Sequence, residues 1–162
     1  MLIAAAAVYG GVCYTALKRE QLNELKALCH MLRVMQDELE TRALPLPELA
    51  AQLEERTESA GKALLSGLLR RLPVLGSRDF QSIWKESVTE SVRYSGEAAR
   101  LLCTLGSFLG RYDVDSQLEA IRSCRETLEK LRTTAAEALP QTRRLGMGLA
   151  LTSGALIVIT LI

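Results

Sequence analysis

Leu145–Ile162 reads LGMGLALTSGALIVITLI, and this stretch at the end of the chain contains no charged residue. Met1–Leu17 at the start, MLIAAAAVYGGVCYTAL, contains none either, so all 20 basic and 19 acidic residues lie between Lys18 and Arg144. A charged side chain costs several kcal/mol at the centre of a bilayer, and two such runs avoid that cost. Each run would span about 26 Å as a helix, and basic side chains beside it can reach the membrane surface. We therefore expect transmembrane helices at residues 1–17 and 145–162.

The basic residues next to the two runs predict the orientation of the chain. Lys18–Arg19 and Arg143–Arg144 both stand on the side that faces the middle of the sequence. By the positive-inside rule, residues 18–144 form a cytoplasmic domain and both termini lie outside. A cleaved signal peptide would need a basic residue before its apolar segment, and none precedes Leu17. A buried core helix is the alternative for the last run, but GALIVITLI offers little polar surface to water.

The composition of the middle segment excludes some classes of function. The formal net charge of the chain is +1, so there is no basic excess to bind the phosphates of a nucleic acid. The four cysteines, Cys13, Cys29, Cys103 and Cys124, form no C-x-x-C pair. In the cytoplasm they are expected to stay reduced and to act as small apolar groups.

Apolar residues recur with helical spacing throughout the middle segment. No proline or glycine stands between Val12 and Leu44, so we expect the first membrane helix to continue into the cytosol. The expected boundaries in the first half are Pro45 and Pro47 after the first helix, about Ser59 after the second, a bend or weak point at Gly61, and Pro73–Gly76 after the third.

The second half continues the helical pattern. Trp84 shares one helical face with Phe80, Ile83 and Val88, which predicts that it is buried. We expect Ser77 to be the N-cap of the helix that contains Trp84, Ser95–Gly96 to be a break, and Gly110 to be the end of the following helix. The last cytosolic helix should start near Asp113 or Asp115 and be kinked or broken at Pro140. We predict an all-α fold, with a cytosolic bundle of about six helices between an N-terminal and a C-terminal transmembrane helix.

Residues that could carry chemistry are few. The only histidine, His30, lies in the middle of a predicted helix and has no metal-ligand partner at a suitable spacing. Asp113 and Asp115 could bind a divalent metal, but two carboxylates at a helix start also favour the helix dipole and cap free N–H groups. We therefore expect no catalytic residue, no metal and no cofactor, and we interpret the protein as a non-enzyme.

Two features favour binding instead. Small residues four positions apart form smooth strips on both membrane runs, and such strips let another helix approach closely, although they are also common in membrane helices generally. Residues 37–58 carry a net charge of −5, whereas residues 59–78 carry +4. The acidic stretch should lie at the tip of the bundle, roughly 37 Å from the membrane, either as a solvated face or as a docking surface for a basic partner. The residues of the strips are Ala6 with Gly10, Ala7 with Gly11, and Gly146, Ala150 and Gly154.

The chain resembles the stage III sporulation protein AB family over its whole length. The two apolar ends and the total size agree with that family, and so does a set of short motifs in a fixed order. These are Leu32-x-x-Met35-x-x-Glu38-Leu39 before Pro45-Leu46-Pro47-Glu48, then Trp84, then Leu109-Gly110-Arg111-Tyr112-Asp113 with Gln117, and finally Leu145-Gly146.

This resemblance implies a component of the channel, or feeding tube, between mother cell and forespore in endospore-forming bacteria. The cytosolic bundle is then similar to the F domains of type II secretion and type IV pilus platforms. The implied partners are the cytosolic secretion-type ATPase, stage III sporulation protein AA, and other membrane proteins of the channel. The implied location is the mother-cell or outer forespore membrane. The candidate contact or turn-setting residues are Asp37, Glu38, Glu48, Asp113 and Gln117.

Two other classes of function stay open at this point. The first is a membrane-anchored scaffold, or a more general platform component, that associates with itself through Gly146, Ala150 and Gly154. The second is an enzyme or metal-dependent regulator that uses Asp113, Asp115 and His30. Copurification separates the first from the adaptor, because an adaptor brings an ATPase with it and a scaffold brings only itself.

Overall fold

The computed structural model of the chain describes residues 2–42, 44–109 and 113–161. These ranges contain helices and no strand, which confirms the all-α prediction. The elements are α1 (Leu2–Arg42), α2 (Leu46–Arg56), α3 (Ser59–Arg71), the 3-10 helix η1 (Leu72–Val74), α4 (Phe80–Ser91), α5 (Gly96–Leu105) and α6 (Val114–Leu161).

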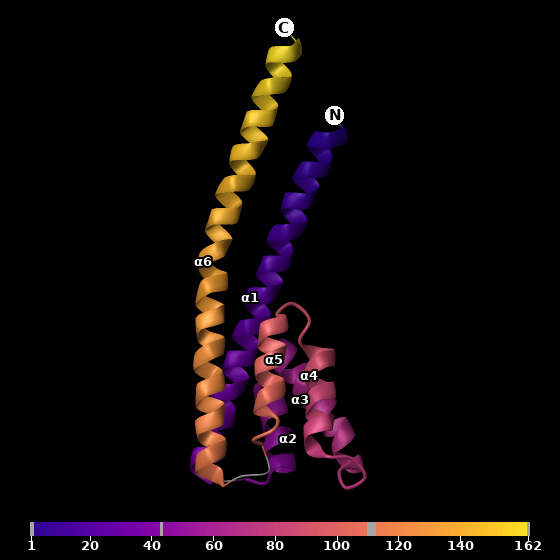
Figure 1. Ribbon diagram of the computed structural model, residues 1–162, viewed down its shortest axis with the longest axis vertical. Coiled ribbons are helices and arrows are strands. Elements are labelled where there is room, and N and C mark those ends of the chain that lie inside the picture. Colours follow the sequence, from indigo (N-terminus) through magenta and orange to yellow (C-terminus); the bar gives the residue numbers. More distant parts are fainter. Residues whose placement is uncertain (1, 43, 110–112, 162) are drawn as a thin grey trace.

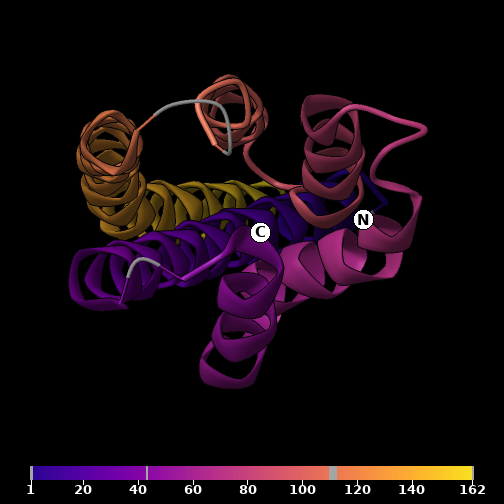
Figure 2. The same cartoon turned by 90° about the horizontal axis from the view of Figure 1, so that it is seen from below.

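The two longest helices, α1 and α6, lie side by side and reach far beyond the other four (Figure 1). Both termini therefore lie at one end of the molecule, and α2–α5 pack against one side of the pair at its other end (Figure 1). Seen from below, α2 and α3 lie on one side of α1 and α5 lies beside α6 (Figure 2). Each long helix passes the expected membrane boundary, 17/18 or 144/145, without a break. In the described part of the chain, no helix has both the length and the apolar character needed to cross a membrane.

The core confirms the helical faces expected from the sequence. Trp84 is fully buried, its Nε1 donates a hydrogen bond to the carbonyl oxygen of Leu102 at 2.6 Å, and its ring centre lies 6.0 Å from that of Phe80. The other large side chains that are almost completely buried come from α1, α2, α3 and α4; they are Leu25, Leu28, Met31, Leu32, Met35, Leu49, Leu53, Leu64, Leu65, Leu68 and Ile83.

The predicted N-cap Ser77 is wrong. Asp79 caps α4 instead, because its carboxylate accepts hydrogen bonds from both the N–H and the hydroxyl of Ser82. The hydroxyl of Ser77 donates to the carbonyl oxygen of Val74, within the turn that precedes the helix. Serine and aspartate are both favoured N-cap residues, so residue type alone does not distinguish Ser77 from Asp79. The position of the turn determines which of them caps the helix.

Of the bend or weak point expected at Gly61, the structure contradicts the bend. Gly61 lies inside α3, and the break between α2 and α3 falls at Thr57 and Glu58. A Cβ at Gly61 would lie 3.1 Å from the Cβ of Met31 on α1. This glycine therefore allows a close approach of two helices rather than a bend.

Two further boundaries differ from expectation. α5 ends at Leu105 with Gly106 as its C-cap, earlier than the expected end at Gly110, which lies outside the described residues. α6 begins at Val114, as expected, but continues past Pro140 to Leu161, so no break occurs there. A proline removes one backbone hydrogen bond, and a helix of 48 residues keeps its other bonds on both sides of it.

Candidate functional site

Three helix ends meet at the end of the bundle that lies far from the termini, which we call the distal end. They are the end of α1, the start of α2 and the start of α6 (Figure 1). Asp37, Glu48 and Asp113 belong to these helix ends and are exposed, and Gln117 is half-buried in the first turns of α6. The structure thus brings four of the five predicted contact residues to one end of the molecule.

The fifth predicted contact residue, Glu38, points into the bundle. It is 8% exposed, its Oε1 accepts a hydrogen bond from Nη1 of Arg56, and its Oε2 lies 3.8 Å from Nε of Arg42. These contacts join α1 to the end of α2. Glu38 therefore has a structural role, and its carboxylate is not available as part of an exposed acidic surface.

Asp113 caps α6. Its Oδ1 accepts a hydrogen bond from the Ser116 hydroxyl at 2.7 Å, and its Oδ2 accepts one from the Ser116 N–H at 3.3 Å. The Ser116 hydroxyl and N–H both hold the pKa of this carboxyl below its usual value. The main-chain oxygen of Asp113 accepts from the N–H of Gln117 at 3.1 Å, so the two predicted residues form one helix start. No cluster of His, Cys, Asp and Glu that could hold a metal occurs among the described residues.

The opposite charges expected in residues 37–58 and 59–78 are partly neutralised by other elements. In the acidic stretch, Oε1 of Glu40 lies 3.6 Å from Nη2 of Arg122 on α6, and Glu38 pairs with Arg56. In the basic stretch, Arg71 pairs with Glu86 and Glu90, and Arg78 also pairs with Glu86. The acids of residues 37–58 that remain exposed are Asp37, Glu40, Glu48, Glu55 and Glu58.

The distal end also exposes large apolar side chains that the sequence analysis did not single out. Val74 and Leu75 are 44% and 46% exposed in the turn before α4. Phe108, after α5, is 39% exposed, and Val114, the first residue of α6, is 41% exposed. Five hydrogen bonds order the turn before α4: from Leu75 N–H to Leu72, from Ser77 and Arg78 N–H to Val74, from Gly76 N–H to Arg78, and from the Ser77 hydroxyl to Val74. Val74 and Leu75 stand between Pro73 and Gly76, outside the helical repeat of apolar residues. This position is the feature of the sequence that could have indicated their exposure.

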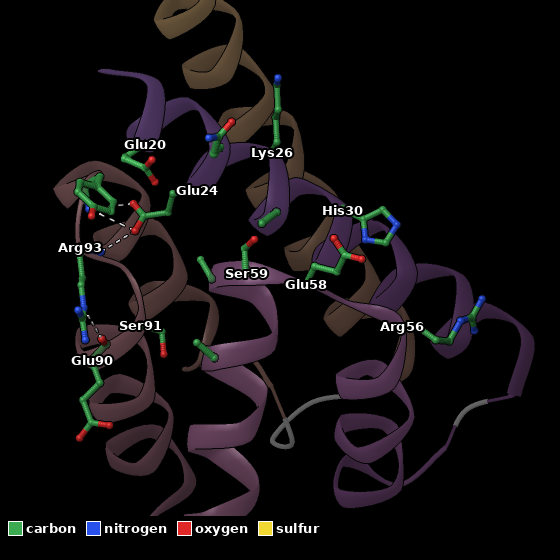
Figure 3. Close-up of a pocket in the computed structure, with 15 residues that line it drawn as sticks. Glu20, Glu24, Lys26, His30, Arg56, Glu58, Ser59, Glu90, Ser91 and Arg93 are labelled. Carbon is green, nitrogen blue, oxygen red and sulfur yellow. Dashed lines mark hydrogen bonds between the residues drawn. The ribbon is translucent and has the colours of Figure 1, made fainter. Parts of the chain in front are cut away.

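A groove of about 790 Å³ lies at the other end of the bundle, where α1 and α6 leave it (Figure 3). α1, the start of α3 and the end of α4 form its walls, and His30 is exposed on one of them. The charged residues that line the groove carry both signs; they are Glu20, Glu24, Lys26, Arg56, Glu58, Glu90 and Arg93.

Glu24 is the residue whose role the sequence analysis missed. Its side chain is 5% exposed, and its carboxylate accepts hydrogen bonds from the backbone N–H groups of Arg93, Tyr94 and Ser95 at 2.6 to 3.2 Å. These amides form the loop between α4 and α5 (Figure 3). Because the partners are backbone groups about 70 residues away, no pattern of residue types could have indicated them.

The comparisons with known proteins agree with the fold. The sequence model described as stage III sporulation protein AB matches residues 1–162. The chain belongs to this sporulation family. A solved structure titled stage III sporulation protein AB has a TM-score of 0.65 and 21% identity with it, over 75% of this chain and 97% of that chain. At this identity the likeness shows the shared fold. No curated protein matches the chain.

The structure places some of the residues of the sequence motifs. Trp84 forms the centre of the core, and Glu38 and Asp113 stabilise turns and helix ends. Gly110, Arg111 and Tyr112 lie outside the described residues. The small residues of the predicted strips belong to α1 and α6, and their side chains also lie outside the described part; they are Ala6, Ala7, Gly10, Gly11, Gly146, Ala150 and Gly154.

Proposed function

We propose that this protein is a non-enzymatic, membrane-anchored adaptor of the sporulation channel between mother cell and forespore. In this proposal it lies in the mother-cell or outer forespore membrane, with residues 18–144 in the cytoplasm. It couples the cytosolic secretion-type ATPase, stage III sporulation protein AA, to the other membrane proteins of the channel. Family membership and the two charge-free ends support this proposal.

One observation carries the docking part of the proposal. The distal end, far from both termini, combines exposed carboxylates with exposed large apolar side chains (Figure 1). Apolar side chains at the centre of an interface supply most of its affinity, whereas charges around them mainly accelerate association. An adaptor needs such a surface on the side facing the cytosol, and here it involves Asp37, Glu48, Leu75 and Phe108.

The test measures binding of the ATPase to the full chain in lipid nanodiscs. Asp37→Lys with Glu48→Lys should lower the association rate several-fold at low salt, and much less near 0.5 M, where screening acts over ~4 Å. Leu75→Ser should instead raise the dissociation rate. The matched control reverses Glu20 and Glu97, which are exposed acids away from the distal end, and should leave binding unchanged.

Glu38 must stay unchanged in this experiment, because its reversal would break the contact between α1 and α2. If both distal variants fold and bind the ATPase as the parent chain does, the distal end is not the docking surface. If the parent chain captures only copies of itself, the adaptor proposal gives way to the self-associating scaffold.

A further inference from the structure

The loop between α4 and α5 lies at the end of the bundle from which the long parts of α1 and α6 emerge (Figure 1). Glu24 of α1 fixes the position of this loop along the axis of α1, because its carboxylate accepts hydrogen bonds from the backbone N–H groups of residues 93–95. Glu24 stands about 10 Å further along the helix axis than Leu17, the last residue of the predicted membrane run. The polar headgroup layer extends roughly 5–8 Å beyond the hydrocarbon core. The loop therefore lies close to the height of this layer.

The loop has two inward and two outward residues. Val92 and Ser95 are 7% and 4% exposed, whereas Arg93 and Tyr94 are exposed. Their backbone cannot easily turn inward, because Glu24 holds three consecutive amides. The Arg93 side chain folds back along α4, where its Nε donates to the carbonyl oxygen of Glu90 (Figure 3). Tyr94 lies at the rim of the groove between α1 and α4, and it is 45% exposed, so it is the large side chain of this loop that stays accessible.

Tyrosine is enriched at the boundary between membrane and water, because its ring is apolar and its hydroxyl is polar. α1 has an aromatic and a basic residue together at the same end: Tyr14 is 51% exposed, and Nζ of Lys18 lies 5.7 Å from the centre of its ring. Tyr94 places a second exposed tyrosine at this end of the bundle, on a different element. The acid nearest to the loop, Glu24, is buried and bound to the loop amides. The acids next to the loop in the sequence, Glu90 and Glu97, lie within α4 and α5, and Glu90 is paired with Arg71.

We propose that Tyr94 contacts the lipid headgroups, so that the α4–α5 loop is a membrane contact beside the two long helices. This inference rests on the membrane anchoring in the proposed function. Two helices that leave the bundle side by side leave it free to tilt about the line that joins them. A third contact, displaced from that line onto α4 and α5, restricts this tilt.

The test uses the full chain in nanodiscs of phosphatidylcholine and phosphatidylglycerol, with the four native cysteines replaced by Ala. An environment-sensitive fluorophore is attached to a single new cysteine at position 17, 75, 93 or 94. Lipids with a nitroxide on the headgroup then quench the fluorophores that lie near the membrane surface. We expect quenching at 94 comparable to that at 17, and none at 75 in the distal turn. The fluorophore at position 93 repeats the quenching measurement on the same loop in a chain that keeps Tyr94.

Each outcome bears on one proposal. Quenching at 17 without quenching at 93 and 94 overturns the loop contact and leaves the membrane anchor standing. Absence of quenching at 17 overturns the anchor, and the loop contact with it. Helical circular dichroism of each labelled chain checks that the replacements leave the fold intact.

Discussion

At the scale of single residues, one buried carboxylate connects two distant parts of the chain. Glu24 accepts the N–H groups of three consecutive residues, and in water these groups would bind solvent. Inside the fold they depend on this one side chain, because a buried donor without an acceptor costs about 1–3 kcal/mol. Glu24 is therefore a residue that positions the α4–α5 loop.

Glu24→Ala should lower the free energy of unfolding by about 2 kcal/mol or more, since it leaves the amides of the loop without their acceptor. Chemical denaturation followed by circular dichroism measures this change. Glu20→Ala is the control, because Glu20 is an exposed acid one turn earlier on α1 and should change stability by less than about 0.5 kcal/mol. Equal stability of the two variants would show that water replaces the carboxylate without cost.

Cys124 predicts how stability depends on pH. Burial raises the pKa of this thiol to about 12, with a smaller contribution from the nearby Cys29. Below the ordinary thiol pKa of about 9 both folded and unfolded chains keep the proton, so the stability there does not depend on this group. Between pH 9 and 12 the unfolded chain releases the proton and the folded chain keeps it.

This difference in proton binding should lower the free energy of unfolding by up to roughly 1.4 kcal/mol per pH unit above pH 9. Denaturation of the parent chain and of Cys124→Ala at pH 8 and pH 10.5 measures the contribution of the thiol. The loss between the two pH values should be smaller in the variant. The same loss in both proteins would contradict the assignment to Cys124.

At the scale of elements, α4 and α5 depend on contact between one tryptophan and one glycine. A Cβ at Gly106 would lie 2.2 Å from Cδ1 of Trp84, so only glycine fits at the end of α5 while the indole keeps its hydrogen bond to Leu102. Gly96 at the start of α5 has open space around its Cβ position. Glycine is therefore required at the end of α5, whereas a larger residue fits at its start.

Gly106→Ala should destabilise the protein by about 1–3 kcal/mol through overpacking, whereas Gly96→Ala should be neutral or slightly stabilising. Thermal unfolding of both variants tests this difference, and near-ultraviolet circular dichroism reports whether the Trp84 ring has moved. If Gly106→Ala melts like Gly96→Ala, the indole can move aside without loss of packing.

The order and type of these elements could be predicted from the sequence, and their exact ends could not. Helical spacing correctly placed Trp84 in the core, because periodicity reports which face of a helix is apolar. It could not choose between Ser77 and Asp79 as a cap, or between Gly106 and Gly110 as a helix end. Those choices depend on tertiary contacts, as do the inward turn of Glu38 and the role of Glu24.

At the scale of the whole molecule, the orientation in the membrane stays a prediction. Basic residues next to both charge-free runs predict that residues 18–144 share one side. Glu55 is exposed on α2, so Glu55→Cys provides a test in a chain whose native cysteines have been replaced. In intact cells, this cysteine should not react with an impermeant thiol reagent. It should react after the cells are permeabilised. Reaction in intact cells would place the bundle outside and exclude contact with a cytosolic ATPase.

The continuity of α1 and α6 has a mechanical consequence. Each is a single helix through the boundary between the bundle and its apolar run, and Pro140, close to this boundary in α6, does not interrupt the helix. A force applied at the distal end therefore acts on two stiff rods, roughly 60 and 70 Å long, whose far ends must move with it. If a partner twists or tilts the bundle, the opposite ends of the two helices are displaced. Motion can then pass along the molecule while its internal conformation stays the same.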